Sequence, residues 1–190
     1  EIRGAGDILG AKQSGQIAAV GFELFTELLE ETIQRLKGED LTERVEPEIK
    51  LRIPAFIPED FVKDANQRLV VYKKLTQVIS EEEVTDIRAE LVDRYGKPPL
   101  AVEYLLEMMK LRLVFKKLLV CEAEFDGKRL TFSFHEKTPV SPDLIIALIK
   151  SQPKRYQFTP DFKLVAESVD TSFDGVLLES RNLLKKLGGI

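Results

Sequence analysis

The first fifteen residues combine a glycine-punctuated backbone with two long polar side chains. Glycines interrupt this stretch in Arg3-Gly4-Ala5-Gly6, at Gly10 and in Gln13-Ser14-Gly15, with almost no apolar periodicity between them. Because glycine adopts backbone conformations that other residues resist, the pattern predicts an ordered loop rather than a helix or strand. Arginine donates through a planar fork, and a glutamine amide both donates and accepts. Arg3 and Gln13 could therefore bond backbone, phosphate or each other.

Two common phosphate-binding loops do not fit this stretch. In a G-x-G-x-x-G pattern starting at Gly4 the third glycine would fall on Leu9, and no strand can precede it in so few residues. A G-x-x-x-x-G-K-[ST] loop does not occur, and Gly127-Lys128 belongs to a predicted hairpin turn. A loop that merely connects two elements remains the alternative for this motif.

Other residue types suited to catalysis or metal binding are scattered. The only histidine, His135, ends a predicted strand and is interpreted as a surface residue. The only cysteine, Cys121, excludes an internal disulfide framework and is predicted to be a small buried side chain. Glu81-Glu82-Glu83 would point in different directions from a helix, and they complement its dipole. We therefore expect no catalytic site, no metal and no cofactor in this chain.

Charge distribution argues against strong nucleic-acid binding by the chain itself. Residues 1–45 carry 5 basic and 9 acidic side chains, and residues 46–190 carry 23 of each. Neither part produces the basic field that holds DNA. Four cations (Lys110, Arg112, Lys116 and Lys117) cluster on one predicted helix, which we interpret as a solvated helix end. No apolar run approaches the roughly 20 residues that span a bilayer.

The periodicity of apolar residues predicts the secondary structure. Residues 17–37 are predicted to form a helix with an apolar stripe, and the polar residues 39–46 look like a linker and the best domain boundary. A strand ending at Pro54 follows, and then a helical stretch opening at Pro58 with an apolar stripe (Phe61, Ala65, Leu69, Tyr72, Leu75 and Ile79). Four later helices are predicted, from Ser80 to Tyr95 and over residues 100–118, 141–151 and 172–187. A hairpin is predicted from strands 121–125 and 130–134, with its turn at Asp126-Gly127. Two further short strands are predicted at 155–158 and 162–167.

These elements define the expected fold class. Helices come first and short antiparallel strands cluster later, which predicts an α+β fold. We expect an N-terminal loop and long helix over residues 1–45, followed over residues 46–190 by a compact domain of about five helices with a small, mostly antiparallel sheet.

The glycine spacing of the opening residues, with its flanking Arg3 and Gln13-Ser14-Gly15, resembles the TRG motif shared by the DNA translocases RecG and Mfd. Downstream, residues 21–30 look like the helix that follows this motif in the Mfd family, the transcription-repair coupling factors. Residues 68–74 and 90–96 are similar to the C-terminal domain of that family. The resemblance covers essentially the whole chain. Since the chain starts at Glu1, inside the motif and without methionine, we expect it to be a C-terminal piece of a larger bacterial, cytoplasmic protein.

The resemblance implies a role for the opening loop. The parent would be a superfamily 2 helicase-type ATPase that uses ATP and Mg²⁺ to move along duplex DNA, displaces stalled RNA polymerase and recruits UvrA for nucleotide excision repair. The TRG residues would couple hydrolysis to translocation; in this sequence they are Arg3, Gly4, Gly6, Gly10, Gln13, Ser14 and Gly15. By the same resemblance residues 46–190 are an autoinhibitory domain that covers the UvrA-recruiting domain of the parent.

The contact for that autoinhibition falls on the predicted helix from Ser80 to Tyr95. Its buried stripe would be Val84, Ile87, Leu91 and Tyr95, so that Glu90 and Asp93 point away and Arg94 flanks them. The resemblance implies that Glu90, Asp93 and Arg94 contact the UvrA-recruiting domain, and outward carboxylates suit a basic partner. Two alternatives stay open: a RecG-like fork-remodelling parent, and a stand-alone interaction module without an inhibitory role. The sequence does not give the oligomeric state.

Overall fold

A computed structural model describes residues 45–168 and 170–188 of the chain. The expected N-terminal loop and helix therefore lie outside the described residues. Within the described ranges no helix is long and apolar enough to cross a membrane. The elements in chain order are β1 (Glu48–Lys50), α2 (Ala65–Gln77), α3 (Glu81–Tyr95), α4 (Leu100–Lys117), β2 (Val120–Phe125), β3 (Arg129–Phe134), α5 (Pro142–Ser151), β4 (Tyr156–Phe158), β5 (Lys163–Glu167) and α6 (Phe173–Lys186).

The strands form one five-stranded sheet in the order β1-β2-β3-β5-β4. Its pairs are antiparallel except β1 with β2, which confirms the expected α+β fold with a mostly antiparallel sheet. The hairpin turns where it was predicted. The Asp126 side chain accepts hydrogen bonds from the backbone N–H groups of Lys128 and Arg129, and Gly127 takes a φ of 104° that suits glycine.

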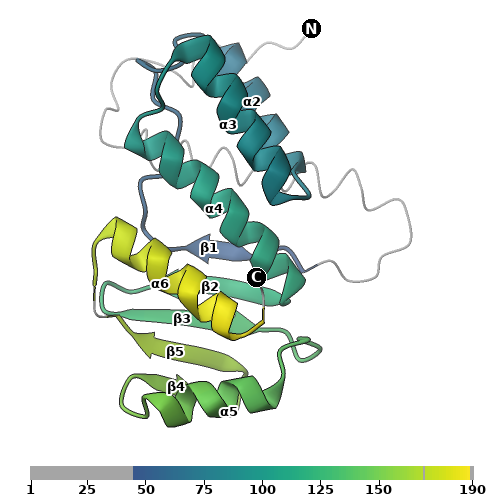
Figure 1. Ribbon diagram of the computed structural model, residues 1–190, viewed down its shortest axis with the longest axis vertical. Helices are drawn as coiled ribbons and strands as arrows, with labels where there is room; N and C mark the ends of the chain where they lie inside the picture. Colours follow the sequence, from purple (N-terminus) through teal and green to yellow (C-terminus); the bar gives the residue numbers. More distant parts are fainter. Residues whose placement is uncertain (1–44, 169, 189–190) are drawn as a thin grey trace, which may run out of the picture.

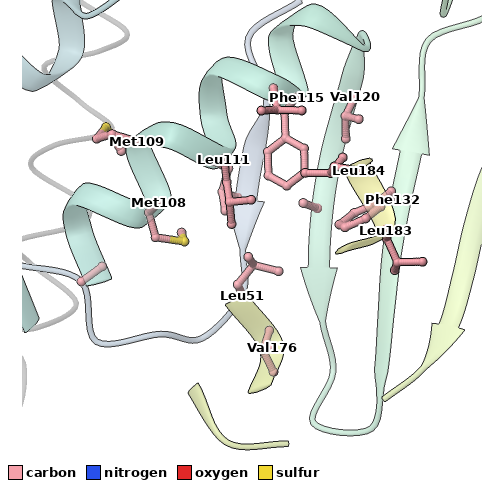
Figure 2. Close-up of a cluster of buried hydrophobic side chains, with 14 of the residues drawn as sticks. Leu51, Met108, Met109, Leu111, Phe115, Val120, Phe132, Val176, Leu183 and Leu184 are labelled. Atoms are coloured by element: carbon pink, nitrogen blue, oxygen red, sulfur yellow. The ribbon is translucent and has the colours of Figure 1, made fainter. Parts of the chain in front are cut away.

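Helices α4 and α6 lie over one face of the sheet, and the α2–α3 pair lies on the far side of α4 from the strands (Figure 1). The core is built where α4 and α6 meet the sheet, with the rings of Phe115 and Phe132 in edge-to-face contact at 5.4 Å (Figure 2). Met108 and Met109 of α4 are buried and fill this core. Cys121, which was predicted to be buried, is only half-buried, and it lies where strand pairing shifts between Val120 and Glu122.

Three helices begin at serine caps, and the sequence predicted a helix start at each of these serines. The hydroxyls of Ser80, Ser141 and Ser172 accept hydrogen bonds from backbone N–H groups at the starts of α3, α5 and α6. These caps satisfy donors that have no partner within the helix. The predicted starts of the later helices are therefore confirmed.

The helix predicted from Pro58 is wrong at its start and in its apolar face. Residues 59–61 form a turn, and α2 begins at Ala65 after Asp64, whose carboxylate caps the N–H groups of Asn66 and Gln67 at 2.7 and 3.1 Å. With this start the buried side chains of α2 are Val71, Tyr72, Leu75 and Thr76. Leu69 and Ile79, both placed in the expected stripe, are 39% and 82% exposed.

The first strand is also shorter than predicted. It ends at Lys50, and Arg52 takes a φ of 56°, which is incompatible with a continuous extended strand. Leu51 is nevertheless buried, so the alternation of apolar residues predicted its burial correctly even though it lies after the last paired residue of β1.

Candidate functional site: the outer face of α2 and α3

The two groups of predicted functional residues differ in what the structure says about them. The TRG residues Arg3 to Gly15 lie outside the described residues. Glu90, Asp93 and Arg94 lie on the outer side of α3, which packs on α2 and α4. The surface of α2 and α3 around these three residues is called the α2–α3 face below.

Local sequence fixes the position of α3. The N–H of Glu83 donates to the Ser80 hydroxyl at 3.2 Å, and the Glu83 carboxylate accepts from the N–H of Ile79 at 2.9 Å. The helix ends at Gly96, with a φ of 85°, whose N–H donates to the carbonyl of Val92. Val84 and Leu91 are buried and Ile87 and Tyr95 are half-buried, so the predicted inward stripe is confirmed.

Glu90 was predicted to point away from the buried stripe, but its carboxylate is held in two ion pairs. Its Oε2 lies 2.6 Å from Nζ of Lys74 on α2, and its Oε1 lies 3.1 Å from Nη1 of Arg94. The hydrogen bond from Lys74 is the main reason why the pKa of Glu90 is lowered from its ordinary value, against the opposing effect of burial. The carboxylate therefore bridges α2 and α3 while its side chain stays 37% exposed.

Arg94 is held from three sides. Its Nη2 donates to Oε1 of Gln67 on α2 at 2.8 Å, its Nη1 donates to Glu90, and its guanidinium lies 5.1 Å from the centre of the Tyr95 ring. Asp93 is different. It is exposed, as predicted, and it has no ion-pair partner among the residues that the structure describes. Of the two carboxylates predicted to contact a partner, Asp93 is thus the more available one.

A shallow groove of about 310 Å³ runs between α2 and α3 next to Glu90. Its lining combines charged rims with apolar residues: Lys74, Gln77, Val78, Glu83, Asp86, Ile87 and Glu90. Within the described ranges no group of three or more His, Cys, Asp or Glu side chains could hold a metal ion. The arrangement of carboxylates, one lysine and exposed apolar atoms suits recognition of another surface.

The buried ion pair of Arg112 is the feature that the sequence interpretation missed. Arg112 was expected on a solvated helix end, but it is only 2% exposed. Its Nη2 lies 2.6 Å from Oε1 of Glu46, and Lys116 lies 2.6 Å from Oε2 of the same carboxylate. The signal was the i, i+4 spacing of the two cations, which places them on one side of α4. Their partner was in the expected linker, so no local pattern connected them.

A second cavity of about 170 Å³ lies between α6 and the end of β4. There the centre of the Tyr156 ring lies 5.3 Å from the Arg155 guanidinium and 5.7 Å from the Lys186 ammonium, and Arg155 forms an ion pair with Glu179. His135 closes a turn after β3, where its Nδ1 accepts from the N–H of Lys137 at 3.1 Å. Neither feature places a nucleophile beside a base.

Comparison with known proteins places the chain in a family. The TRCF domain family matches residues 51–145, half of the chain, and this match includes α2, α3 and α4. The transcription-repair-coupling factor of Myxococcus xanthus is 38% identical over 188 residues, covering 98% of this chain and 16% of its own length. The factor of Escherichia coli K12 is 39% identical over 163 residues, covering 83% of this chain and 14% of its own length.

A solved structure shares the fold. The crystal structure of the C-terminal domain of a transcription-repair coupling factor superposes with a TM-score of 0.65 at 22% identity, covering 78% of this chain and 98% of that one. The chain spans about a sixth of the length of the curated relatives named above. From residue 51 to residue 145, the chain belongs to the TRCF domain family.

Proposed function

We propose that residues 46–190 are the regulatory domain of a transcription-repair coupling DNA translocase. In this proposal the domain covers the UvrA-recruiting surface of the same protein until the motor engages DNA. The observation that carries the proposal is the TRCF match over residues 51–145, because it contains the whole α2–α3 face. The similarity to named transcription-repair-coupling factors over 98% and 83% of the chain supports the same assignment.

The chemistry of the α2–α3 face supports a protein contact of moderate strength. Asp93 offers an exposed carboxylate, Glu90 offers a partly exposed one, and Val92 between them is 40% exposed. Carboxylates around a small apolar spot suit a partner with basic side chains. Such a contact would need to contribute only about 3–5 kcal/mol, because a two-state switch moves from mostly closed to mostly open over that range.

Residues 1–45 are proposed to be the tail of the motor, and the boundary between the two parts is placed after residue 45. The TRG residues would couple ATP hydrolysis to movement along duplex DNA and so to displacement of stalled RNA polymerase. ATP and Mg²⁺ would bind to motor lobes that precede this chain in the parent protein, in the bacterial cytoplasm. The chain by itself is expected to hydrolyse no ATP.

The alternatives from the sequence differ in what they require. A RecG-like parent would share only the opening motif, and it gives no account of the TRCF match over residues 51–145. A stand-alone interaction module would use the same α2–α3 face without covering a UvrA site. These two functions are separated by whether changes on the face alter UvrA recruitment by the parent.

A charge reversal at Asp93 in the full-length parent tests the proposal. Asp93→Arg is the cleaner change, since Glu90 also ties α2 to α3 through Lys74. It should raise affinity for UvrA, because an opposed charge at an interface can cost about 2–5 kcal/mol. Glu136→Arg is the matched control, at an exposed position in the turn after β3. Equal UvrA affinity in a folded Asp93→Arg variant and the unaltered protein would remove Asp93 from the contact.

A further inference from the structure

The two cations on Glu90 are held in different ways. Arg94 is fixed by Gln67 and by the Tyr95 ring as well as by Glu90. Among the residues that the structure describes, the Lys74 ammonium has one polar partner, Oε2 of Glu90 at 2.6 Å. The Lys74 side chain is 43% exposed. Lys74 is thus the cation that can leave Glu90 without breaking any other contact.

The groove beside Glu90 can accommodate the Lys74 ammonium after it separates from Glu90. Asp86 and Glu83 line the same groove as Lys74 and Glu90, so the ammonium would stay near negative charge after it moves. Lysine has a flexible stem and a hydrated point charge, which makes such a move easy. The other oxygen of Glu90 remains bonded to Arg94, so the carboxylate keeps its orientation during the exchange.

We propose that Lys74 is an internal counterion which a cationic side chain of the docking partner replaces on Glu90. Lys74 therefore weakens docking, and the strength of the autoinhibitory contact is set by competition between two cations for one carboxylate. This inference rests on the proposed function. The proposed function alone does not predict the direction of the effect: removal of Lys74, a residue on the docking face, should strengthen the contact.

The test uses the 190-residue chain and the UvrA-recruiting domain of its parent, added as a separate protein. The dissociation constant is measured by NMR titration, which detects binding up to millimolar concentrations. Lys74→Met should bind about two- to five-fold more tightly, the range expected for releasing a carboxylate from an exposed ion pair. Lys73→Met is the matched control, since Lys73 is the exposed neighbour and makes no ion pair among the described residues. It should change affinity less than Lys74→Met does.

A double-mutant cycle with Glu90 separates competition from a general change in charge. Glu90→Gln should bind more weakly than the unaltered chain, and adding Lys74→Met to Glu90→Gln should change nothing further. Unchanged or weaker binding by Lys74→Met would overturn the inference, and so would a gain that persists without the Glu90 carboxylate. Lys74→Gln is a second variant that must change affinity in the same direction.

The same titration distinguishes a failure of the proposed function from a failure of this inference. If the unaltered chain does not bind the UvrA-recruiting domain even at millimolar concentration, the autoinhibitory contact itself is contradicted. If the unaltered chain binds but Lys74→Met gives no gain, the contact stands and the competition by Lys74 is contradicted.

Discussion

The guanidinium of Arg112 forms an ion pair with the carboxylate of Glu46, a residue 66 positions earlier in the chain. Nη2 of Arg112 lies 2.6 Å from Oε1 of Glu46, and Nε donates to the same oxygen at 2.7 Å. Arg112 lies in the central helix α4, and Glu46 lies two residues before the edge strand β1. This pair therefore fastens the beginning of the described domain to its core helix, which a short strand alone would hold weakly.

Removal of the Glu46 carboxylate should destabilise the domain. Glu46→Gln leaves the charge of Arg112 buried without a counterion, and we expect a loss of about 3 kcal/mol in the free energy of unfolding. That is the low end of the range for a broken buried pair, because the Glu46 side chain is 26% exposed. Lys116→Met removes the partly exposed cation on the same carboxylate and should cost at most about 1 kcal/mol. Urea unfolding of the two variants checks this order; equal losses would contradict it.

Two buried tyrosine hydroxyls should respond oppositely to removal. The Tyr72 hydroxyl accepts a hydrogen bond from the buried N–H of Ile57 at 2.9 Å, so Tyr72→Phe should cost about 1–2 kcal/mol. The Tyr95 hydroxyl is buried and makes no hydrogen bond to the described part of the chain. Tyr95→Phe should therefore be neutral, or should raise stability by up to about 1 kcal/mol. Thermal unfolding of the two variants distinguishes them, and a loss at Tyr95 as large as that at Tyr72 would show that its hydroxyl has a partner.

The acid titration of Glu90 should report on Lys74. The pKa of Glu90 is lowered first of all by the hydrogen bond from Lys74, so the pair stabilises the fold above the ordinary glutamate pKa. That stabilisation is lost as pH falls through the lowered folded-state pKa. In Lys74→Met the pKa of Glu90 should rise toward its ordinary value, as followed by the NMR shift of its carboxyl carbon. Lys73→Met should leave the pKa of Glu90 unchanged, and an equal rise of this pKa in both variants would argue against a specific pair of Lys74 and Glu90.

Gly175 is required by a contact at the start of α6. A Cβ at this buried position would collide with Cγ of Asp170 and would lie 2.6 Å from its Cβ. Asp170 accepts a hydrogen bond from the N–H of Ser172, the residue that caps α6, at 2.9 Å. Gly175→Ala should therefore destabilise the domain by about 1 kcal/mol or more, although alanine is the better helix former.

A second substitution identifies the cause of that loss. Asp170→Gly removes the side chain that the new methyl group would meet, so Gly175→Ala should cost less in the Asp170→Gly background than in the unaltered chain. Additive losses measured by urea unfolding would assign the effect of Gly175→Ala to something other than Asp170.

Features decided by neighbouring residues were predicted from the sequence. Serine caps set the starts of three helices, and Asp126 with Gly127 set the hairpin turn, because each of these interactions lies within a few residues. The start of α2 shows the limit of such patterns. The apolar spacing continues back to Phe61, yet the carboxylate of Asp64 caps the helix three residues later.

Features decided by distant residues were not predicted. Glu90 was placed outward by helical spacing, but its partner Lys74 lies on another helix, 16 positions away. Arg112 was placed in solvent because Glu46 lies 66 positions away in a segment that looked like a linker. Side-chain charge alone does not reveal which pairs the fold brings together. The outward position of Asp93, which depends on helical spacing alone, was predicted correctly.

Residues 46–190 are proposed to cover the UvrA-recruiting surface of the parent protein. The affinity of the full-length parent for UvrA is compared with that of a version ending at residue 45, so that Glu46 and Arg112 are removed together. We predict that truncation raises the affinity by about a hundredfold or more, since about 3 kcal/mol of closure corresponds to that factor. The 190-residue chain, added back separately, should lower it again. Equal affinities of the intact and truncated proteins for UvrA would contradict the account.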